Sequence, residues 1–147
     1  MERSYVIENA RERERLRNLV NQISDEELSL NLYLEGWTVA VTLAHLAFWD
    51  ERRLAMIRKW KQEGVTPSPI DQDIVNDAMV PLLLAIPPRE AANLSVLTAE
   101  KIDRELAEIS PDLIRDIESA GDQHALNRSI HRKIHLDDIE HCINREL

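Results

Sequence analysis

The chain has 147 residues, 44% of them hydrophobic, and a formal net charge of −9 at pH 7; this is enough for one globular domain with its own core. The negative charge would repel a phosphate backbone, so we expect no nucleic-acid partner. No apolar run reaches the roughly 18–20 residues that span a bilayer, and the first residues lack the apolar core of a signal peptide. We therefore expect a cytoplasmic protein without membrane contact. Its one cysteine, Cys142, cannot form an internal disulfide, as expected in a reducing compartment.

The first half of the chain predicts two long helices joined by a short one. Residues 4–22 carry apolar residues at helical spacing among many Arg and Glu residues. Ser24 begins a capping-box pattern for a short turn or helix that ends near Leu32. The second long helix is expected from Thr38, its N-cap, to about Gln62, and Gly64 ends it.

The second half of the chain predicts more helices, separated by prolines and glycines. Pro81 should kink or end the first of them, and Ser110 with Pro111 forms an N-cap and first-turn pair. We expect these helices, in chain order, at Asp71–Leu84, Pro88–Ile109, Pro111–Ala120 and from about His124 to the C-terminus. The predicted fold is all-α: a single four-helix bundle over residues 1–147, with short helices in the connections.

The last predicted helix carries His131 and His135, four residues apart. This spacing stacks two imidazoles on one helix face, where they can ligate one divalent metal, although two histidines can also fall on a helix by chance. A helical wheel places Lys133, Asp137, Glu140 and Asn144 on the opposite, solvent-facing side. Ile130 and Ile134 flank the histidines on one edge, and Ile139 and Ile143 flank them on the other. The pair is therefore predicted to point into the bundle.

His45 shares one face of the second long helix with apolar residues. Trp49 and Met56 are on that face, and Glu51 and Arg58 are on the opposite one. A lone histidine on an apolar face is more often a hydrogen-bonded core residue than a ligand. Three inward histidines on two helices, His45 with the late pair, favour a metal site with an open position for water or substrate.

Other polar residues could serve the same cavity. Arg52 lies two turns beyond His45 and could bind an anionic substrate group, or its side chain could extend to solvent. Asp138 could orient an imidazole from outside the ligand set, or lie solvated at the helix edge. Cys142 is read as a small buried residue rather than a ligand, and His124 as too near the helix end. Asp50 and Arg53 are read as charges at the rim.

Two segments resemble the DinB-like superfamily, also called the YfiT-like metalloenzymes. The first is Gly36-Trp37-Thr38-Val39 with Leu43-Ala44-His45-Leu46-Ala47-Phe48-Trp49-Asp50, and the second runs from His131 to Ile139. The resemblance implies a four-helix bundle in up-down-down-up order, with His45, His131 and His135 as ligands of a divalent metal, nickel or zinc. Relatives such as the bacillithiol and mycothiol transferases imply that a low-molecular-weight thiol is activated on the metal.

Two functional hypotheses follow. The first is a metal-dependent thiol S-transferase or hydrolase that acts on a small electrophile. The second is a non-catalytic ligand-binding or stress-associated bundle, in which the histidines are hydrogen-bonded in a polar core. A large separation between His45 and the late pair would favour the second. Exposed apolar helix faces would allow a homodimer.

Overall fold

The computed structural model describes residues 3–146, which form eight helices and no β-strand. The helices are α1 (Ser4–Gln22), α2 (Asp25–Leu28), α3 (Val39–Glu63), α4 (Gln72–Leu84), α5 (Pro88–Glu108), α6 (Pro111–Ser119), α7 (Gln123–Leu126) and α8 (Ser129–Glu146). One isolated antiparallel bridge joins Asn31 to Thr38. The predicted all-α fold class is confirmed. None of these helices combines the length and the apolar character needed to cross a membrane.

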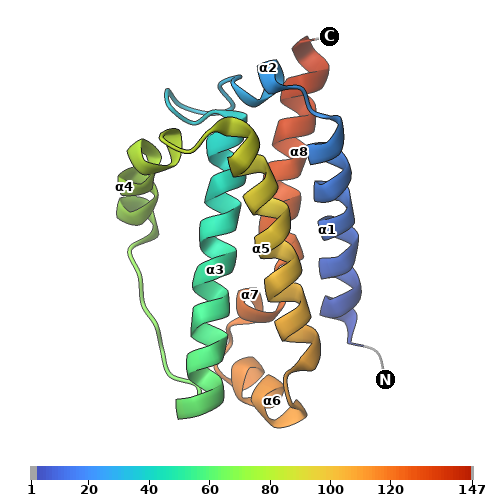
Figure 1. Cartoon of the computed structure of the whole chain (residues 1–147). Coiled ribbons are helices and arrows are strands. Elements are labelled where there is room, and N and C mark those ends of the chain that lie inside the picture. Colours follow the sequence, from blue (N-terminus) through green and yellow to red (C-terminus); the bar gives the residue numbers. More distant parts are fainter. Residues whose placement is uncertain (1–2, 147) are drawn as a thin grey trace.

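The four long helices α1, α3, α5 and α8 lie side by side and form the body of the molecule (Figure 1). Each of them packs against two others, with contacts between α3 and α5, α1 and α5, α1 and α8, and α3 and α8. In the view of Figure 1 the chain ascends through α1, descends through α3 and α5, and ascends again through α8. Helix α4 stands beside α3, and α6 and α7 lie at the lower end.

Local capping explains where several of these helices begin. Thr38 accepts a hydrogen bond from the Val41 amide at 3.1 Å, so it caps α3 as predicted. Ser24 forms the predicted capping box of α2. Ser110 caps α6 with proline in its first turn, also as predicted. Gly64 ends α3 with a φ of 86°, a left-handed value that side chains disfavour.

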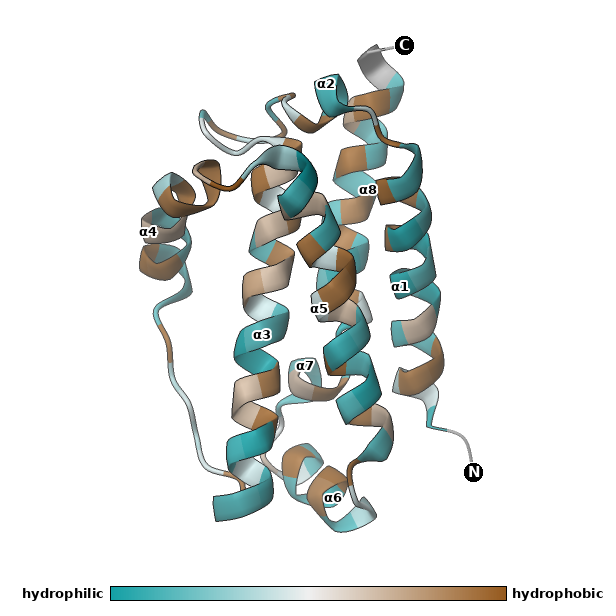
Figure 2. Cartoon of the chain, in the orientation of Figure 1, coloured by the Kyte–Doolittle hydropathy of each residue, from teal (hydrophilic) through white to brown (hydrophobic). Residues whose placement is uncertain are grey.

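Apolar side chains fill the space between the long helices in two clusters. The first joins α1, α3, α5 and α8 and includes Leu16, Leu43, Ala99 and Leu136, all fully buried. The second lies towards the end that carries α6 and α7, where Ile57 is among the buried residues. Figure 2 shows hydrophobic residues recurring along the long helices at intervals, as expected for helices that bury one face.

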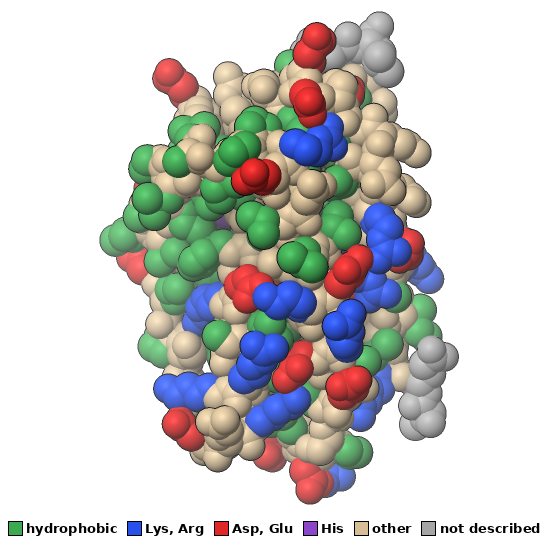
Figure 3. Space-filling model, viewed as in Figure 1, with side chains coloured by type: hydrophobic (Ala, Val, Ile, Leu, Met, Phe, Trp, Pro, Cys, Tyr) green, Lys and Arg blue, Asp and Glu red, His purple; other side chains and the backbone are tan. Residues whose placement is uncertain are grey.

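Helix α4 has the opposite distribution, because most of its apolar side chains face outwards. Only Met79 is buried, whereas Ile74, Leu82 and Leu84 are exposed. Figure 3 shows hydrophobic side chains gathered on the upper left, where α4 lies in Figure 1, above a region where acidic and basic residues alternate. Pro81 was expected to kink or end this helix, but α4 continues to Leu84.

The prediction of one continuous last helix from His124 was wrong. The helix is interrupted after α7, where Asn127 adopts an extended conformation, and α8 begins at Ser129. Asn9 of α1 stabilises this interruption. Its amide donates to the Leu126 carbonyl at 2.9 Å, and its Oδ1 accepts from the backbone amides of Arg128 and Ser129 at 2.8 and 2.9 Å. One buried asparagine thus satisfies three backbone groups at the junction and fixes where α8 starts.

Candidate metal centre

Three histidines from two helices converge on one point. His45 comes from the first half of α3, and His131 and His135 come from successive turns of α8. The Nε2 atom of His131 lies 3.1 Å from that of His45 and 3.2 Å from that of His135. Within the described part of the chain, these three residues form a group that could hold a metal ion, with one ligand atom from each lying within 4.8 Å of the others.

This spacing fits a divalent metal. A tetrahedral zinc site with Zn–N bonds of about 2.0–2.1 Å separates its ligand nitrogens by about 3.3 Å, close to the observed values. The ligand set is made of imidazoles alone, which suits zinc, nickel and other borderline metals. Three protein ligands leave a further coordination position open, as in catalytic rather than structural sites.

Tyr33 fixes the orientation of the His135 ring. The Tyr33 hydroxyl lies 2.9 Å from His135 Nδ1 and donates to Asp138 Oδ2 at 2.5 Å. Burial raises the pKa of Tyr33, and its hydrogen bond to Asp138 adds to this, so the hydroxyl keeps its proton. Since that proton is directed at a carboxylate, which can only accept, the Tyr33 oxygen must accept from His135 Nδ1–H. His135 therefore presents a bare Nε2 to the centre.

Protons alone cannot satisfy the three converging nitrogens. If His135 Nε2 carries no proton, a proton on His131 Nε2 can form a well-aligned hydrogen bond to His135 or to His45, but not to both. If His131 Nε2 is also bare, two lone pairs face each other at 3.2 Å. A single cation accepts lone pairs from all three nitrogens at once, which is the usual reason for imidazoles to converge.

Burial keeps the three imidazoles neutral. Desolvation lowers the pKa of His45 to about 3, and the neighbouring His135 adds to the effect. Desolvation also lowers the pKa of His131 to about 2, with further contributions from the other two histidines and from Arg128 and Arg132. The pKa of His135 is lowered by burial, against the opposing effect of Asp138. Neutral imidazole is the form that binds a metal, so the ligands need not lose a proton near pH 7.

The histidines open into a cavity of about 610 Å³ between α3, α4, α8 and the segment before α3. Apart from the three histidines, its lining combines aromatic and apolar side chains with a few polar ones, which is the usual composition of a small-molecule site. The aromatic lining residues are Tyr33, Trp37 and Trp49. The polar ones are Arg53, Gln72, Asn76, His124, Arg128 and Asp138. The Trp49 indole donates to Asn76 Oδ1 at 3.0 Å, which holds α4 against the cavity.

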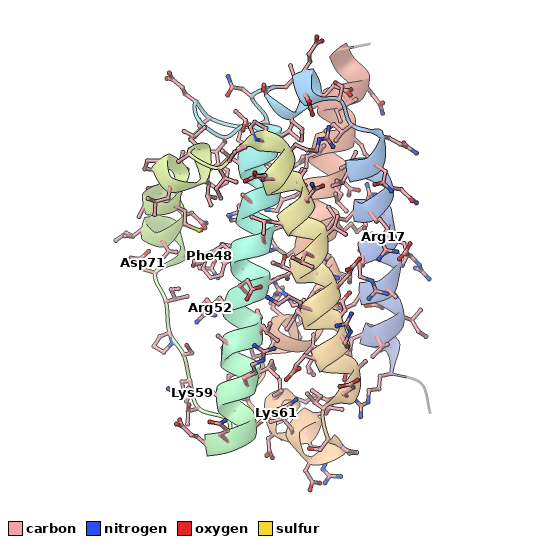
Figure 4. All side chains as sticks on the ribbon, viewed as in Figure 1. Arg17, Phe48, Arg52, Lys59, Lys61 and Asp71 are labelled. Carbon is pink, nitrogen blue, oxygen red and sulfur yellow. The ribbon has the colours of Figure 1, made fainter. Side chains whose placement is uncertain are left out.

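The other predicted site residues lie in different places. Arg52 is not among the residues that line the cavity: its guanidinium donates to the Ser68 carbonyl and hydroxyl at 2.8 and 3.0 Å and stacks 5.7 Å from the Trp49 ring. Figure 4 shows Arg52 pointing away from the bundle, towards the segment that precedes α4. Asp138 does contact the ligand set, through Tyr33. His124, expected to lie too far away, lines the cavity, whereas Cys142 does not.

The helical wheel of α8 predicted its buried face only in part. The buried stripe of this helix contains Arg132, Leu136 and Ile139, and the histidines lie beside it, facing the cavity. Ile134, predicted to flank a buried strip, is 54% exposed because the cavity is open on that side. The predicted solvent face is partly covered too, since Arg15 of α1 binds Asp137 and Glu140 at 2.6 and 2.9 Å.

A chain of buried charges lies next to the centre, and the sequence analysis missed it. Arg128 Nε donates to Asp50 Oδ1 at 2.9 Å, and Arg132 reaches Asp50 at 3.3 Å and Asp103 at 2.8 Å. Arg13 of α1 completes the chain with a 2.8 Å contact to Asp103. Asp50 was read as a rim charge and is instead 2% exposed. Its position one residue after Trp49, off the apolar face of the wheel, gave no signal of burial.

Comparison with known families places this site in context. The family model described as the mycothiol maleylpyruvate isomerase N-terminal domain matches residues 10–132. This range contains His45 and His131 and ends three residues before His135. No curated protein and no solved structure matched the chain. Because the match spans most of the sequence, the chain belongs to the mycothiol maleylpyruvate isomerase N-terminal domain family, a member of the DinB-like superfamily.

Proposed function

We propose that this protein is a metal-dependent enzyme that transfers a low-molecular-weight thiol to a small electrophile. In this proposal His45, His131 and His135 hold the metal, with nickel or zinc as the expected ion. A hydrolase acting on a similar electrophile would use the same site. The observation that carries the proposal is the convergence of three Nε2 atoms, one of which is bare because of Tyr33, on a cavity large enough for a small molecule.

The metal would act as a Lewis acid that lowers the pKa of a thiol or water bound at the open position, giving a nucleophile near neutral pH. The chain's own residues would prepare this position. Tyr33 and Asp138 hold His135 in one tautomer. Trp37 and Trp49 exclude water from one side of the cavity and offer apolar surface to the substrate.

The non-catalytic alternative has less support. It requires the histidines to be hydrogen-bonded in a polar core, yet the Nδ1 atom of His45 is buried without a partner in the described structure. The Nε2 atoms of His45 and His131 are also only 3.1 Å apart, whereas a large separation would have favoured this alternative.

Three wider features are part of the same proposal. The four long helices would correspond to the up-down-down-up bundle of DinB-like proteins, and the protein would work in the cytoplasm on a small molecule, without nucleic acid or membrane. The apolar surface of α4, with Ile74 65% and Leu82 71% exposed, would support a homodimer. None of these features is needed for the chemistry of the site.

Metal analysis tests the proposal. Protein produced without a polyhistidine tag in metal-replete medium should contain about one equivalent of nickel or zinc, and His45→Ala should lose it. His141→Ala, a substitution of an exposed histidine on α8, is the matched control and should keep the metal. The loaded protein should then consume a small thiol in the presence of an electrophile, whereas the metal-free protein should not. Wild-type protein that contains no metal under these conditions would contradict the proposal.

A further inference from the structure

Arg128 is the most deeply buried cation that lines the cavity. Its residue is 3% exposed, and it precedes His131 by three positions, so its side chain lies about one helical turn from a proposed ligand. Two of its three nitrogens are occupied: Nε donates to Asp50 Oδ1 and Nη1 to the His124 carbonyl, each at 2.9 Å. These two contacts hold the guanidinium in a fixed orientation.

The third nitrogen, Nη2, makes no hydrogen bond to any residue in the described part of the chain. It is also absent from the side-chain atoms that are fully enclosed without a partner. Because Arg128 lines the cavity, Nη2 would be available to donate to a molecule bound there. A guanidinium whose Nε and Nη1 are bonded to the protein, and whose Nη2 is not, is suited to binding a carboxylate.

Arg128 shares its one carboxylate partner with another arginine. The buried charges are Arg128 and Arg132 with Asp50 and Asp103, and Arg13, whose side chain is 25% exposed, also binds Asp103. Asp50 is shared between two guanidiniums, so it does not neutralise Arg128 alone.

The other charged residues that line the cavity have partners of their own, and none of them is hydrogen-bonded to Arg128. Arg53 is paired with Asp122 at 2.9 Å, and Asp138 is engaged by Tyr33. Burial lowers the pKa of Arg128, and the like charges of Arg53 and Arg132 act in the same direction, although Asp50 opposes them. A buried cation with incomplete compensation is costly, and an anion in the cavity would relieve that cost.

We infer that Arg128 is the anion-binding group of this cavity, and that the site takes a small molecule with a carboxylate group and an apolar body. The carboxylate would accept hydrogen bonds from Arg128, and the apolar body would lie against Trp37 and Trp49. The anion contact would thus come from Arg128 rather than from Arg52, which is engaged by Ser68 outside the cavity. This inference rests on the proposed function only in calling that molecule a substrate.

A pair of matched probes tests the inference through tryptophan fluorescence, because two tryptophans line the cavity. The probes are 3-phenylpropionate and 3-phenylpropanol, which differ in the charge of one terminal group. Both are titrated into zinc-loaded protein and into protein stripped with a chelator. Hydrogen bonds to charged groups predict at least about tenfold tighter binding of the carboxylate in both forms.

Substitutions assign the preference to a residue. Arg128→Gln should bring the two probes to nearly equal affinity, and Arg128→Lys, which keeps a charge beside Asp50, should retain part of the difference. Arg53→Gln is the matched control on the same cavity and should keep the full preference. If Arg128→Gln fails to fold, the wild-type and Arg128→Lys titrations still decide the question.

Equal affinity for the two probes in both forms would overturn the inference. A preference seen only with zinc would also overturn it, because the metal would then be the carboxylate receptor. A preference that is lost in Arg53→Gln but kept in Arg128→Gln would also overturn it, because the carboxylate contact would then belong to Arg53. The metal content of each sample is measured separately, so a failure to bind zinc contradicts the proposed function without affecting the titration of the stripped protein.

Discussion

Tyr33 orients the proposed metal ligand His135, although Tyr33 lies in the segment before α3, far from α8 in the sequence. Its hydroxyl accepts from His135 and donates to Asp138, so it sets which His135 nitrogen is free. We predict that Tyr33→Phe lowers the affinity for zinc at least about tenfold, as is usual when a partner of a ligating histidine is removed. Competition with a chelator of known affinity measures this. Tyr5→Phe, which removes a hydroxyl bonded to Leu106 instead, is the control and should leave the affinity unchanged.

Arg132 stabilises the fold through contacts that solvent cannot replace. It is 1% exposed and donates to Asp50, to Asp103 and to the Asn9 carbonyl. Arg132→Met would leave two buried carboxylates short of a partner, so we predict a loss of about 3–5 kcal/mol in the free energy of unfolding, measured in urea. A loss as small as that of Arg115→Met, which breaks an exposed pair and should cost under about 1 kcal/mol, would contradict this reading.

At the scale of the elements, the break between α7 and α8 determines the register of both α8 histidines. Asn9 maintains this break from α1 by bonding to the Leu126 carbonyl and to two backbone amides. Asn9→Leu should leave the Leu126 carbonyl and the Arg128 amide without their Asn9 partner, and so cost about 1–3 kcal/mol of stability, whereas the Ser129 amide keeps Asn127. It should also weaken zinc binding, because His131 lies at the start of α8. Asn18→Leu, on the exposed side of α1, is the matched control and should change neither quantity.

The elements themselves were largely predictable, because their signals are local. Thr38, Ser24 and Ser110 cap helices at the expected positions, and His45 is on the buried face that the wheel of α3 predicts. The α7–α8 junction was not predictable, because it depends on a contact between residues more than 110 positions apart. The same is true of Tyr33, which lies in a segment without helical periodicity.

Buried charge was the main feature that helix wheels could not reveal. A wheel assigns Asp50 and Arg132 to the polar side by type, whereas in the structure each is buried because it finds a partner on another helix. We infer the anion contact at Arg128 rather than Arg52 for the same reason, since Arg128 is buried through its contact with Asp50 of α3. Arg52 and its neighbour Arg53 likewise differ only in their partners, which are Ser68 and Asp122.

For the molecule as a whole, the neutral histidine cluster should make the metal-free protein sensitive to acid. A histidine in the unfolded chain has a pKa of about 6.5, whereas burial lowers the pKa of His45 to about 3 and that of His131 to about 2. Between these values the unfolded state binds more protons, so stability is full above about pH 7 and falls as the pH decreases towards 3.

Urea unfolding of chelator-treated protein at pH 7.5, 6.5 and 5.5 measures this loss, before most carboxylates titrate. Each buried histidine should add up to about 1.4 kcal/mol per pH unit to the slope over this range. His131→Leu should give a shallower slope than wild type. A wild-type slope that equals that of His131→Leu would contradict the burial of a neutral imidazole at this position.

We expect one metal ion to be bound by three imidazoles from α3 and α8, so that it joins the two halves of the bundle at the cavity. X-ray absorption spectroscopy of the zinc-loaded protein tests this most directly. The predicted result is a first shell with three histidine nitrogens at about 2.0–2.1 Å and a further light-atom ligand, with one histidine fewer in His45→Ala. A first shell with at most one histidine, or a spectrum that His45→Ala leaves unchanged, would contradict the claim.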